Sequence, residues 1–415
     1  MKAYTPPPDK SVTIRALLLG AVADGSTRVE NPLYCADTGA ALACLEALGV
    51  RHCRDGGALI IEGRGLDGLK KPAGPLDAGE SAALARMLAG LLAGQSFPSV
   101  IAGRGTLLKR PMAPAADALK KLGARVAATK GLLPLTIKPA RLKGARVSGV
   151  TSAQVKSALL LAGLYAAGPV EVKEKFGTRD HTERLLALLG AALSSRAGLV
   201  RLRPGRLTAR PLAVPGDVSS AAPLMAAALL RKEPLKIEGC GLNPTRLGFV
   251  DALVSMGAKI KMKRGNCFPE PCGELEVRPS ALKAAKLAHG DIPSLIDEVP
   301  LLAVLAATAK GVTRIAGIEG LKTKESDRVK STLALLASLG ARAEYKKGAL
   351  IIPGGQKLRA AAPVDTFSDH RIAMAAAAAS AVCPALEIEN PGCVDKSYPG
   401  FWSDFRSVFG GPLRA

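Results

Sequence analysis

The sequence predicts an α/β protein in which one structural unit recurs six times, grouped as two halves of three. Three observations lead to this prediction. A glycine that closes an amphipathic helix pattern recurs along the chain at intervals of 74, 67, 67, 83 and 70 residues. A second, almost entirely apolar helix pattern recurs alongside it, and a β-rich run follows that pattern in most copies. Recurrence at a nearly fixed period is the signature of an internal repeat.

The first recurring element is a helix that ends at a glycine. Its copies end at Gly49, Gly123, Gly190, Gly257, Gly340 and, more weakly, Gly410. Glycine favours the left-handed conformation that commonly follows the last turn of a helix. Extended segments follow at 124–126 and 258–260, so we expect each of these helices to run into a strand.

The second recurring element is a helix pattern without a polar face. Its copies span 16–22, 81–93, 155–166, 220–230, 299–309 and 372–381. A helix that is apolar all round is buried on all sides. β-rich runs follow at 170–172, 235–237 and 312–315. Each repeated unit therefore reads strand, helix, strand, helix, strand.

The join between the two halves is expected near 211–215. Pro211 and Pro215 lie in this segment, and Gly216 follows it. Two prolines and a glycine are typical of a linker or hinge. At 415 residues the chain is long enough to form two or three domains.

The composition favours a folded protein that binds small anions. Hydrophobic residues make up 48% of the chain and charged residues 22%, and the formal net charge is +22. This balance indicates anionic partners, although part of the excess can be surface charge that keeps the protein soluble. Aromatic residues, which single-stranded nucleic acid usually needs as stacking platforms, make up only 3%. We therefore expect small anionic ligands and no nucleic acid.

The cysteines and the apolar runs favour a cytoplasmic protein. The eight cysteines include no C-x-x-C pair and no His/Cys cluster at metal-ligand spacing, so we expect reduced thiols and no metal site. The N-terminus has no apolar signal region, and no apolar run is long enough for a membrane span. We expect no contact with a membrane.

Three basic residues stand at or near the start of an apolar helix. Lys10, Arg15 and Arg371 lie where the helix dipole disfavours a cation by up to about 1 kcal/mol. A bound anion offsets this cost, and helix starts already offer N–H groups to phosphate. Elsewhere ordinary capping is the better interpretation, as for Asp217 and Ser219.

Two further basic motifs lie outside the helix starts. They are Lys-Arg-Pro at 109–111 and Lys-Glu-Ser-Asp-Arg at 324–328. Lys324 and Arg328 share one face of a helix at this spacing. For an isolated motif of this kind, charge balance by the intervening acidic residues is the favoured interpretation. Lys396 near the C-terminus is uninformative by itself.

Taken together and in order, these residues resemble the 5-enolpyruvylshikimate-3-phosphate synthase family of enolpyruvyl transferases. The resemblance covers nearly the whole chain. Its most specific pieces are 9–15, 152–158, 179–182, 324–328, 369–371 and 396–397. Several matches in register are far more specific than any one of them.

The resemblance implies a two-lobed inside-out α/β barrel. Each lobe would hold three of six βαβαββ units with pseudo-threefold symmetry, and the helix starts would face a central cleft. Residues 10–214 would form one lobe and residues 1–9 with 215–415 the other, with the hinge near 9–10 and 211–215. A monomer is expected.

The reaction that the resemblance implies moves the enolpyruvyl group of phosphoenolpyruvate to the 5-hydroxyl of shikimate 3-phosphate and releases phosphate. It needs no metal or organic cofactor. Motif positions assign shikimate 3-phosphate binding to Lys10, Ser11, Arg15, Ser152, Ala153, Gln154, Thr178, Arg179, Asp297 and Lys324. They assign phosphoenolpyruvate binding to Lys10, Ala82, Arg110, Gln154, Arg328, Arg371 and Lys396.

The same resemblance implies a catalytic set of Lys10, Asp297, Glu325 and Lys396. Asp297 matches the base that takes the hydroxyl proton. Glu325 and Lys10 are the candidates for delivering a proton and for stabilising the charge on the departing phosphate. His370 is expected to be a structural neighbour of Arg371.

The chain departs from the family pattern before its second apolar helix. The family usually has Asn-Ser-Gly-Thr or Asn-Ala-Gly-Thr where this chain has Glu80, Ser81, Ala82 and Ala83. We expect the Ala82 methyl group to point into the space of the donor phosphate and Glu80 to bring a negative charge near it. Glyphosate should therefore bind less well than in relatives with glycine. Gly320 also lacks the polar side chain often found at its position.

Three other functions are alternatives to this one. UDP-N-acetylglucosamine enolpyruvyl transferase usually has asparagine after its early lysine and a reactive cysteine before the arginine, whereas Ser11 follows Lys10 here and 103–110 contains no cysteine. An RNA-binding or RNA-end-processing protein built from the same unit suits the charge but not the low aromatic content. A non-catalytic homologue is disfavoured by the retained Asp297, Glu325, Arg371 and Lys396.

Overall fold

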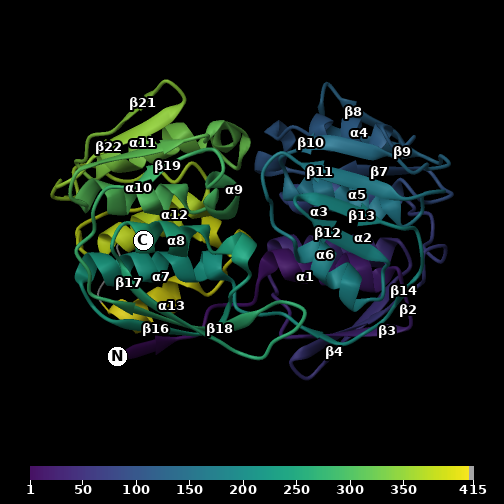
Figure 1. Cartoon of the computed structure of the whole chain (residues 1–415), viewed down its shortest axis with the longest axis horizontal. Helices are drawn as coiled ribbons and strands as arrows, with labels where there is room; N and C mark the ends of the chain where they lie inside the picture. Colours follow the sequence, from purple (N-terminus) through teal and green to yellow (C-terminus); the bar gives the residue numbers. More distant parts are fainter. Residues whose placement is uncertain (411–415) are drawn as a thin grey trace. The chain divides into compact units, whose positions relative to one another are not determined.

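The structure, a computed structural model, describes residues 1–410. The chain separates into two compact units (Figure 1). Residues 8–214 and 268–270 form what we call the N-terminal unit. Of the described residues, 1–7, 215–267 and 271–410 form the C-terminal unit. Each unit has its own cluster of buried hydrophobic residues, so each has its own core.

Five four-stranded sheets share one topology. An edge strand pairs in parallel with the second strand, and the last two strands form a hairpin that pairs antiparallel with it. In the N-terminal unit the sheets are β15(Leu212–Ala213)-β3(Ser26–Glu30)-β5(Ala58–Glu62)-β4(Arg51–Asp55), β6(Leu76–Asp77)-β7(Ser99–Ala102)-β9(Leu132–Lys138)-β8(Arg125–Thr129) and β10(Arg146–Val150)-β11(Val170–Glu174)-β13(Leu199–Leu202)-β12(Leu193–Arg196). In the C-terminal unit they are β1(Lys2–Tyr4)-β16(Leu235–Gly241)-β18(Cys272–Arg278)-β17(Lys259–Arg264) and β19(Lys286–Leu287)-β20(Val312–Ala316)-β22(Ala349–Pro353)-β21(Glu344–Lys346). A small sheet pairs β2(Ala23–Asp24) with β14(Leu207–Thr208).

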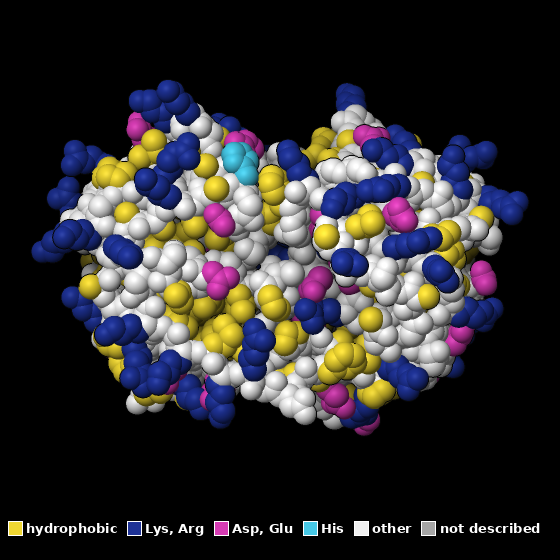
Figure 2. Space-filling model, in the orientation of Figure 1, with side chains coloured by type: hydrophobic (Ala, Val, Ile, Leu, Met, Phe, Trp, Pro, Cys, Tyr) yellow, Lys and Arg dark blue, Asp and Glu magenta, His cyan; other side chains and the backbone are white. Residues whose placement is uncertain are grey.

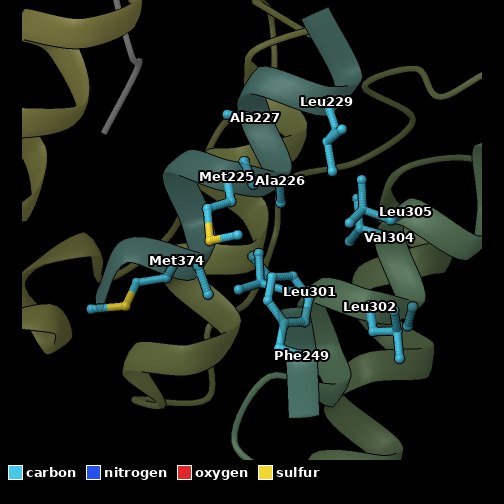
Figure 3. Close-up of a cluster of buried hydrophobic side chains, with 14 of the residues drawn as sticks. Met225, Ala226, Ala227, Leu229, Phe249, Leu301, Leu302, Val304, Leu305 and Met374 are labelled. Atoms are coloured by element: carbon cyan, nitrogen blue, oxygen red, sulfur yellow. The ribbon is translucent and has the colours of Figure 1, made fainter. Parts of the chain in front are cut away.

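The six predicted apolar helices are present and buried. They are α1(Lys10–Ala21), α3(Ala82–Leu92), α5(Ala153–Gly163), α7(Val218–Arg231), α10(Val299–Thr308) and α12(His370–Ser380). In the C-terminal unit α7, α10 and α12 pack against one another. Figure 3 shows Met225, Leu301 and Met374 from these three helices within one apolar cluster. In the N-terminal unit α3 packs against both α1 and α5.

The glycine-terminated helices are also confirmed. They are α2(Ala36–Ala47), α4(Ala113–Lys120), α6(His181–Leu188), α8(Gly248–Ser255), α11(Arg328–Ser338) and α13(Phe401–Phe409). The six predicted glycines follow them with positive φ, from 64° at Gly410 to 95° at Gly257. The remaining helical segments are short: α9(Ile292–Leu295), η1(Gly105–Lys109), η2(Pro244–Arg246), η3(Glu319–Thr323) and η4(Pro391–Lys396).

The edge strands beside α1 and α7 come from distant parts of the chain. The N-terminal strand β1 pairs with β16, so it completes the sheet that follows α7. Strand β15, which lies just before α7 in sequence, pairs instead with β3, which follows α1. β1 therefore completes the sheet whose other strands follow α7, and β15 completes the sheet whose other strands follow α1.

The sixth repeat departs from the predicted βαβαββ pattern. Within residues 1–410 it consists of a parallel bridge between Val364 and Ile388, together with α12 and α13. Within residues 1–410 no strand hairpin follows α13, which is the last element of this repeat. Five repeats thus follow the predicted strand pattern in full and one does not.

Two other findings concern the cysteines and the helix lengths. Cys267 and Cys272 form a disulfide, so the expectation that every thiol is reduced is wrong at this pair. Within residues 1–410, no helix combines the length and the apolar composition that crossing a membrane requires.

Candidate active site

The first predicted anion site lies at the start of α1. Asp9 caps the helix, because its carboxylate accepts a hydrogen bond from the Val12 N–H. Lys10 is the first helical residue, and its Nζ lies 2.8 Å from the Asp37 carboxylate on α2. The predicted location of Lys10 in a first turn is therefore confirmed. Asp37 was not predicted and orients the Lys10 side chain.

Arg15 lies one turn further along α1 and is 4% exposed. Its three nitrogens donate to the Thr182 hydroxyl at 2.8 Å, the Ser11 carbonyl at 2.9 Å and the Ser157 hydroxyl at 3.1 Å. None of these acceptors is a carboxylate. Burial lowers the pKa of Arg15 to about 10, which still leaves the side chain charged at neutral pH. Arg15 is thus a buried cation whose hydrogen bonds are all to neutral groups.

Thr178 and Arg179 follow β11 and are held by a buried ion-pair network. The Glu174 carboxylate accepts from the Thr178 N–H at 3.0 Å and also from its hydroxyl. Lys156 on α5 is 1% exposed and pairs with Glu174 at 3.0 Å and with Glu183 at 2.5 Å. Arg179 is close enough to Arg15 for its charge to contribute to lowering the Arg15 pKa. The two predicted phosphate ligands are therefore electrostatic neighbours.

Arg86, which was not predicted, links Gln154 to the segment that contains Arg110. Arg86 on α3 donates one hydrogen bond to the Gln154 side chain and another, of 2.7 Å, to the Pro111 carbonyl. Arg110, which directly precedes Pro111, is 5% exposed. Arg86 is the only charged residue in an otherwise apolar helix, and this isolation was the signal that could have identified it.

Glu80 and Ala82 lie in the turn before α3 and at the first residue of that helix. The Glu80 carboxylate contacts Thr106, accepting hydrogen bonds from its N–H at 3.1 Å and from its hydroxyl at 2.6 Å. Ala82, the first residue of α3, is 1% exposed and belongs to the apolar core. Ser81 caps α3 by accepting from the Leu84 N–H. The side chains of this segment therefore have structural partners within the N-terminal unit.

In the C-terminal unit, Arg328 is the centre of an ion-pair network. This side chain is 1% exposed and contacts Asp369 at 2.8 Å, Asp297 at 3.0 Å and Glu325 at 2.6 Å. Burial alone lowers the pKa of Arg328, but attraction to the three carboxylates outweighs it and raises the pKa above its ordinary value. Lys324 adds a second cation 3.2 Å from Asp297.

This network supplies the local partners of both cations in the Lys324–Arg328 motif. Both cations do balance acidic side chains, but one of those, Asp297, lies outside the motif. Asp327 is not among the ion-pair partners; it caps α11 by accepting from the Val329 and Lys330 N–H groups. Charge balance and helix capping therefore account for the local structure of the motif.

Arg371 lies beside this network without joining it. Its N–H donates to the Asp369 carboxylate at 2.9 Å, whereas its guanidinium donates to the Ser219 carbonyl at 3.0 Å. The side chain is 9% exposed, and its Nε has no hydrogen-bond partner among residues 1–410. The predicted location of Arg371 in the first turn of α12 is confirmed. The Arg371 guanidinium is thus a second buried cation without a carboxylate contact in the described part of the chain.

Lys396 and His370 complete the C-terminal unit's candidate residues. Lys396 is the last residue of η4, which packs against α12, the helix that carries Arg371. His370 is 3% exposed, and its Nδ1 lies 3.8 Å from Asp369.

Among the described residues of either unit, no three His, Cys, Asp or Glu side chains are grouped so that they could hold a metal ion.

The start of α7 is held by another arginine that was not predicted. Arg246 in η2 is 4% exposed and donates to the Asp217 carboxylate at 3.0 Å and to the Ser219 hydroxyl at 2.6 Å. The capping interpretation of Asp217 is confirmed, because its carboxylate accepts from the Ser219 N–H. The Ser219 carbonyl that contacts Arg371 is thereby part of an ordered helix start.

Comparison with known proteins identifies the family. The family described as EPSP synthase (3-phosphoshikimate 1-carboxyvinyltransferase) matches residues 2–405. The chain belongs to the EPSP synthase family. The 3-phosphoshikimate 1-carboxyvinyltransferase of Bacillus subtilis is 40% identical over 409 residues, covering 97% of this chain and 96% of the relative. That of Syntrophotalea carbinolica is 42% identical over 410 residues, with 97% and 95% coverage.

Solved structures agree with this family. EPSP synthase from Acinetobacter baumannii matches with a TM-score of 0.86 and 34% identity over 99% of this chain and 96% of that one. The enolpyruvyl transferase NikO from Streptomyces tendae matches with a TM-score of 0.77 over 98% and 94% of the two chains, at 18% identity, and so shows a shared fold. The activity of the family is 3-phosphoshikimate 1-carboxyvinyl transfer in the shikimate pathway, and this chain has that activity.

Proposed function

We propose that the two units divide the substrate contacts of this reaction. Residues of the N-terminal unit around Arg15 hold shikimate 3-phosphate, with Ser11, Ser152, Ala153, Gln154, Thr178 and Arg179 as the other ligands. Phosphoenolpyruvate is bound by Lys10, Ala82, Arg110 and Gln154 of that unit and by Arg328, Arg371 and Lys396 of the C-terminal unit. Lys10, Asp297 and Lys324 also contact shikimate 3-phosphate.

One observation supports this proposal above the others. Arg15 and Arg371 are both buried, and neither guanidinium contacts a carboxylate in residues 1–410. A buried charge without an opposite charge is costly, and proteins normally pair it. A bound phosphate or carboxylate supplies the missing charge, and a guanidinium can donate two parallel hydrogen bonds to either group.

Arg328 contributes differently, because its donors are nearly all used. A guanidinium has five N–H groups. Arg328 uses four of them on the Asp297, Glu325 and Asp369 carboxylates, which leaves one on Nη1. We therefore assign Arg328 a single hydrogen bond to phosphoenolpyruvate and a larger role in fixing Asp297 and Glu325.

The chemistry proceeds by addition and then elimination. Asp297 takes the proton of the 5-hydroxyl as its oxygen bonds to C2 of phosphoenolpyruvate, while an acid protonates the C3 methylene to a methyl group. Elimination then breaks the C2–O bond to phosphate and removes a proton from that methyl group, which restores the double bond. Glu325 and Lys10 are the acids and bases for C3, and Lys10 and Lys396 stabilise the leaving phosphate.

The network around Arg328 suits Glu325 to proton transfer at C3. Asp297, Glu325 and Asp369 offer three carboxyl groups to two cations, Lys324 and Arg328. A proton held on Glu325 balances the charge of these five side chains. Returning that proton to the network after elimination restores Glu325, and passing the 5-hydroxyl proton from Asp297 to the departing phosphate restores the base, which completes the cycle.

The assignment predicts that two arginine substitutions act on different substrates. Arg15→Gln should weaken shikimate 3-phosphate binding, and Arg371→Gln should weaken phosphoenolpyruvate binding, each by about 10- to 100-fold, because each removes hydrogen bonds to a charged group. Arg196→Gln, at an exposed position on β12, is the matched control. Isothermal titration of each substrate measures the effect. A variant that binds both substrates more weakly to the same extent, or that binds both as well as the wild type does, would contradict the assignment.

We also propose the finer architecture that the family resemblance implies. Each unit would be an inside-out α/β barrel with pseudo-threefold symmetry, with a hinge near 9–10 and 211–215. The shared strand order of the sheets and the mutual packing of α7, α10 and α12 support this proposal. We further propose that the protein is cytoplasmic and a monomer. Size-exclusion chromatography with light scattering can test whether it is a monomer.

A further inference from the structure

Glu80 is the residue at which the chain departs most from its expected pattern. Its side chain leaves the turn before α3 and reaches η1, where Thr106 donates to the carboxylate from both its N–H and its hydroxyl. Gly105 lies against the same carboxylate, since a methyl group there would be 2.4 Å from Glu80 Oε1. Gly105 also has a φ of +55°, so the start of η1 is shaped to receive the Glu80 side chain.

Backbone hydrogen bonds hold the same two segments together. The Arg104 N–H donates to the Gly79 carbonyl at 2.8 Å, and the Ala78 N–H donates to the Ala102 carbonyl at 2.9 Å. The contact between Glu80 and Thr106 therefore adds to the backbone hydrogen bonds between the turn before α3 and the segment that leads to Arg110. Beyond the backbone link at Arg104, the Glu80 side chain extends the contact into η1.

Arg110 lies between two points at which α3 and the turn before it hold the chain. On one side, η1 runs from Gly105 to Lys109, and the Arg110 N–H donates to the Leu107 carbonyl at 3.1 Å. On the other side, Arg86 donates to the carbonyl of Pro111. Glu80 fixes the segment four residues before Arg110 and Arg86 fixes it one residue after.

We propose that Glu80 is a positioning residue for Arg110: through Thr106 it fixes η1 so that the Arg110 guanidinium meets phosphoenolpyruvate. The proposal rests on the assignment of Arg110 to that substrate. It replaces the expectation that Glu80 acts as a negative charge beside the donor phosphate. A carboxylate with two hydrogen bonds to Thr106 directs its charge toward η1.

The two interpretations predict opposite effects of removing the carboxylate. If Glu80 positions Arg110, Glu80→Ala raises the KM for phosphoenolpyruvate by about 10- to 100-fold, because small displacements of a substrate ligand have effects of this size. The KM for shikimate 3-phosphate stays within about twofold. If Glu80 instead repels the donor phosphate, the same variant lowers the KM for phosphoenolpyruvate.

Three further variants separate geometry from charge. Thr106→Val removes the hydroxyl donor and should raise the KM for phosphoenolpyruvate, and combining it with Glu80→Ala should add little, because the two residues act through one contact. Glu80→Gln removes the charge but keeps an acceptor oxygen, so it should lose less than Glu80→Ala. Thr129→Val on β8 and Glu344→Ala on β21, both at exposed positions, are the controls.

Hydrogen exchange of residues 104–110, followed by mass spectrometry, tests the proposal independently of catalysis. We expect faster exchange in Glu80→Ala and Thr106→Val than in the wild type and the controls. Unchanged exchange in both variants, or a lowered KM for phosphoenolpyruvate in Glu80→Ala, would overturn the proposal. If exchange rises while the KM for phosphoenolpyruvate does not, Glu80 fixes η1 but the assignment of Arg110 fails, which distinguishes the two claims.

Discussion

Individual side chains in this protein are ordered by partners far away in sequence, and this limits what a sequence reveals about them. Lys10, Arg15 and Arg371 could be recognised because each is a cation at or near a helix start. Arg246 could not, since its partner Asp217 lies 29 residues away and only the fold joins η2 to the start of α7. Glu80 was recognised as unusual, yet the location of Thr106, which decides its role, was not predictable.

The Ala82 methyl group provides a test at the residue scale. Ala82→Gly should lower the inhibition constant of glyphosate, because it opens space at the helix start that we assign to the donor phosphate. The substitution costs about 0.5–1 kcal/mol of stability, since glycine loses more backbone entropy in a helix. Inhibition kinetics against phosphoenolpyruvate measure the change. Because Ala82 is 1% exposed, an unchanged constant would show that its methyl group only packs in the core.

At the scale of elements, the repeat was predictable because it depends on local rules. Each Gly with positive φ ends a helix, and each apolar helix is buried, so both patterns can be read from the residues themselves. The pairing of the edge strands β1 and β15 with strands distant in sequence could not be predicted in the same way. Both are only two or three residues long, and pairing in parallel with a distant strand leaves no periodic pattern in so short a segment.

The buried network between β11, α5 and α6 should make stability depend on pH. Burial raises the pKa of Glu183 above its ordinary value, so the folded state holds this proton more tightly than the unfolded state does. Its contribution to the free energy of unfolding is therefore largest at low pH and falls as the pH rises from about 4.3 toward the raised pKa.

Glu183→Gln tests this sign, because glutamine does not titrate. The free energy of unfolding of the wild type minus that of the variant should decrease as the pH rises from about 4 to about 8. Urea unfolding at a series of pH values measures the difference. Glu171→Gln, at a partly exposed position on β11, is the control. A difference that is flat, or that grows with pH, would be inconsistent with the raised pKa.

At the scale of the whole molecule, the positive charge is dispersed. Lys and Arg side chains are scattered over the visible face of each unit and do not form one patch (Figure 2). The net charge of +22 therefore suits general attraction of anions, whereas we propose that the buried arginines select particular ones. Composition predicted the class of ligand, but only burial separates Arg15 and Arg371, the proposed ligand-binding cations, from surface charge.

The proposed division of substrate contacts between the units predicts a change of shape on binding. Two like charges 4 Å apart repel by about 4 kcal/mol at an effective dielectric constant near 20, so bringing basic residues of both units around one site requires bound anions. The radius of gyration should fall when shikimate 3-phosphate and glyphosate are added together. Small-angle scattering measures it, with Arg371→Gln as the comparison. No compaction in the wild type would refute the shared-substrate proposal.

The most direct test of the account is phosphate release by the purified chain. With both phosphoenolpyruvate and shikimate 3-phosphate present, we expect steady release of one phosphate per enolpyruvyl group transferred, and no release when either substrate is omitted. Asp297→Asn should slow this release by at least about 100-fold, because it removes the proposed base. Release that does not require shikimate 3-phosphate, or no release from the folded wild-type chain with both substrates, would contradict the account.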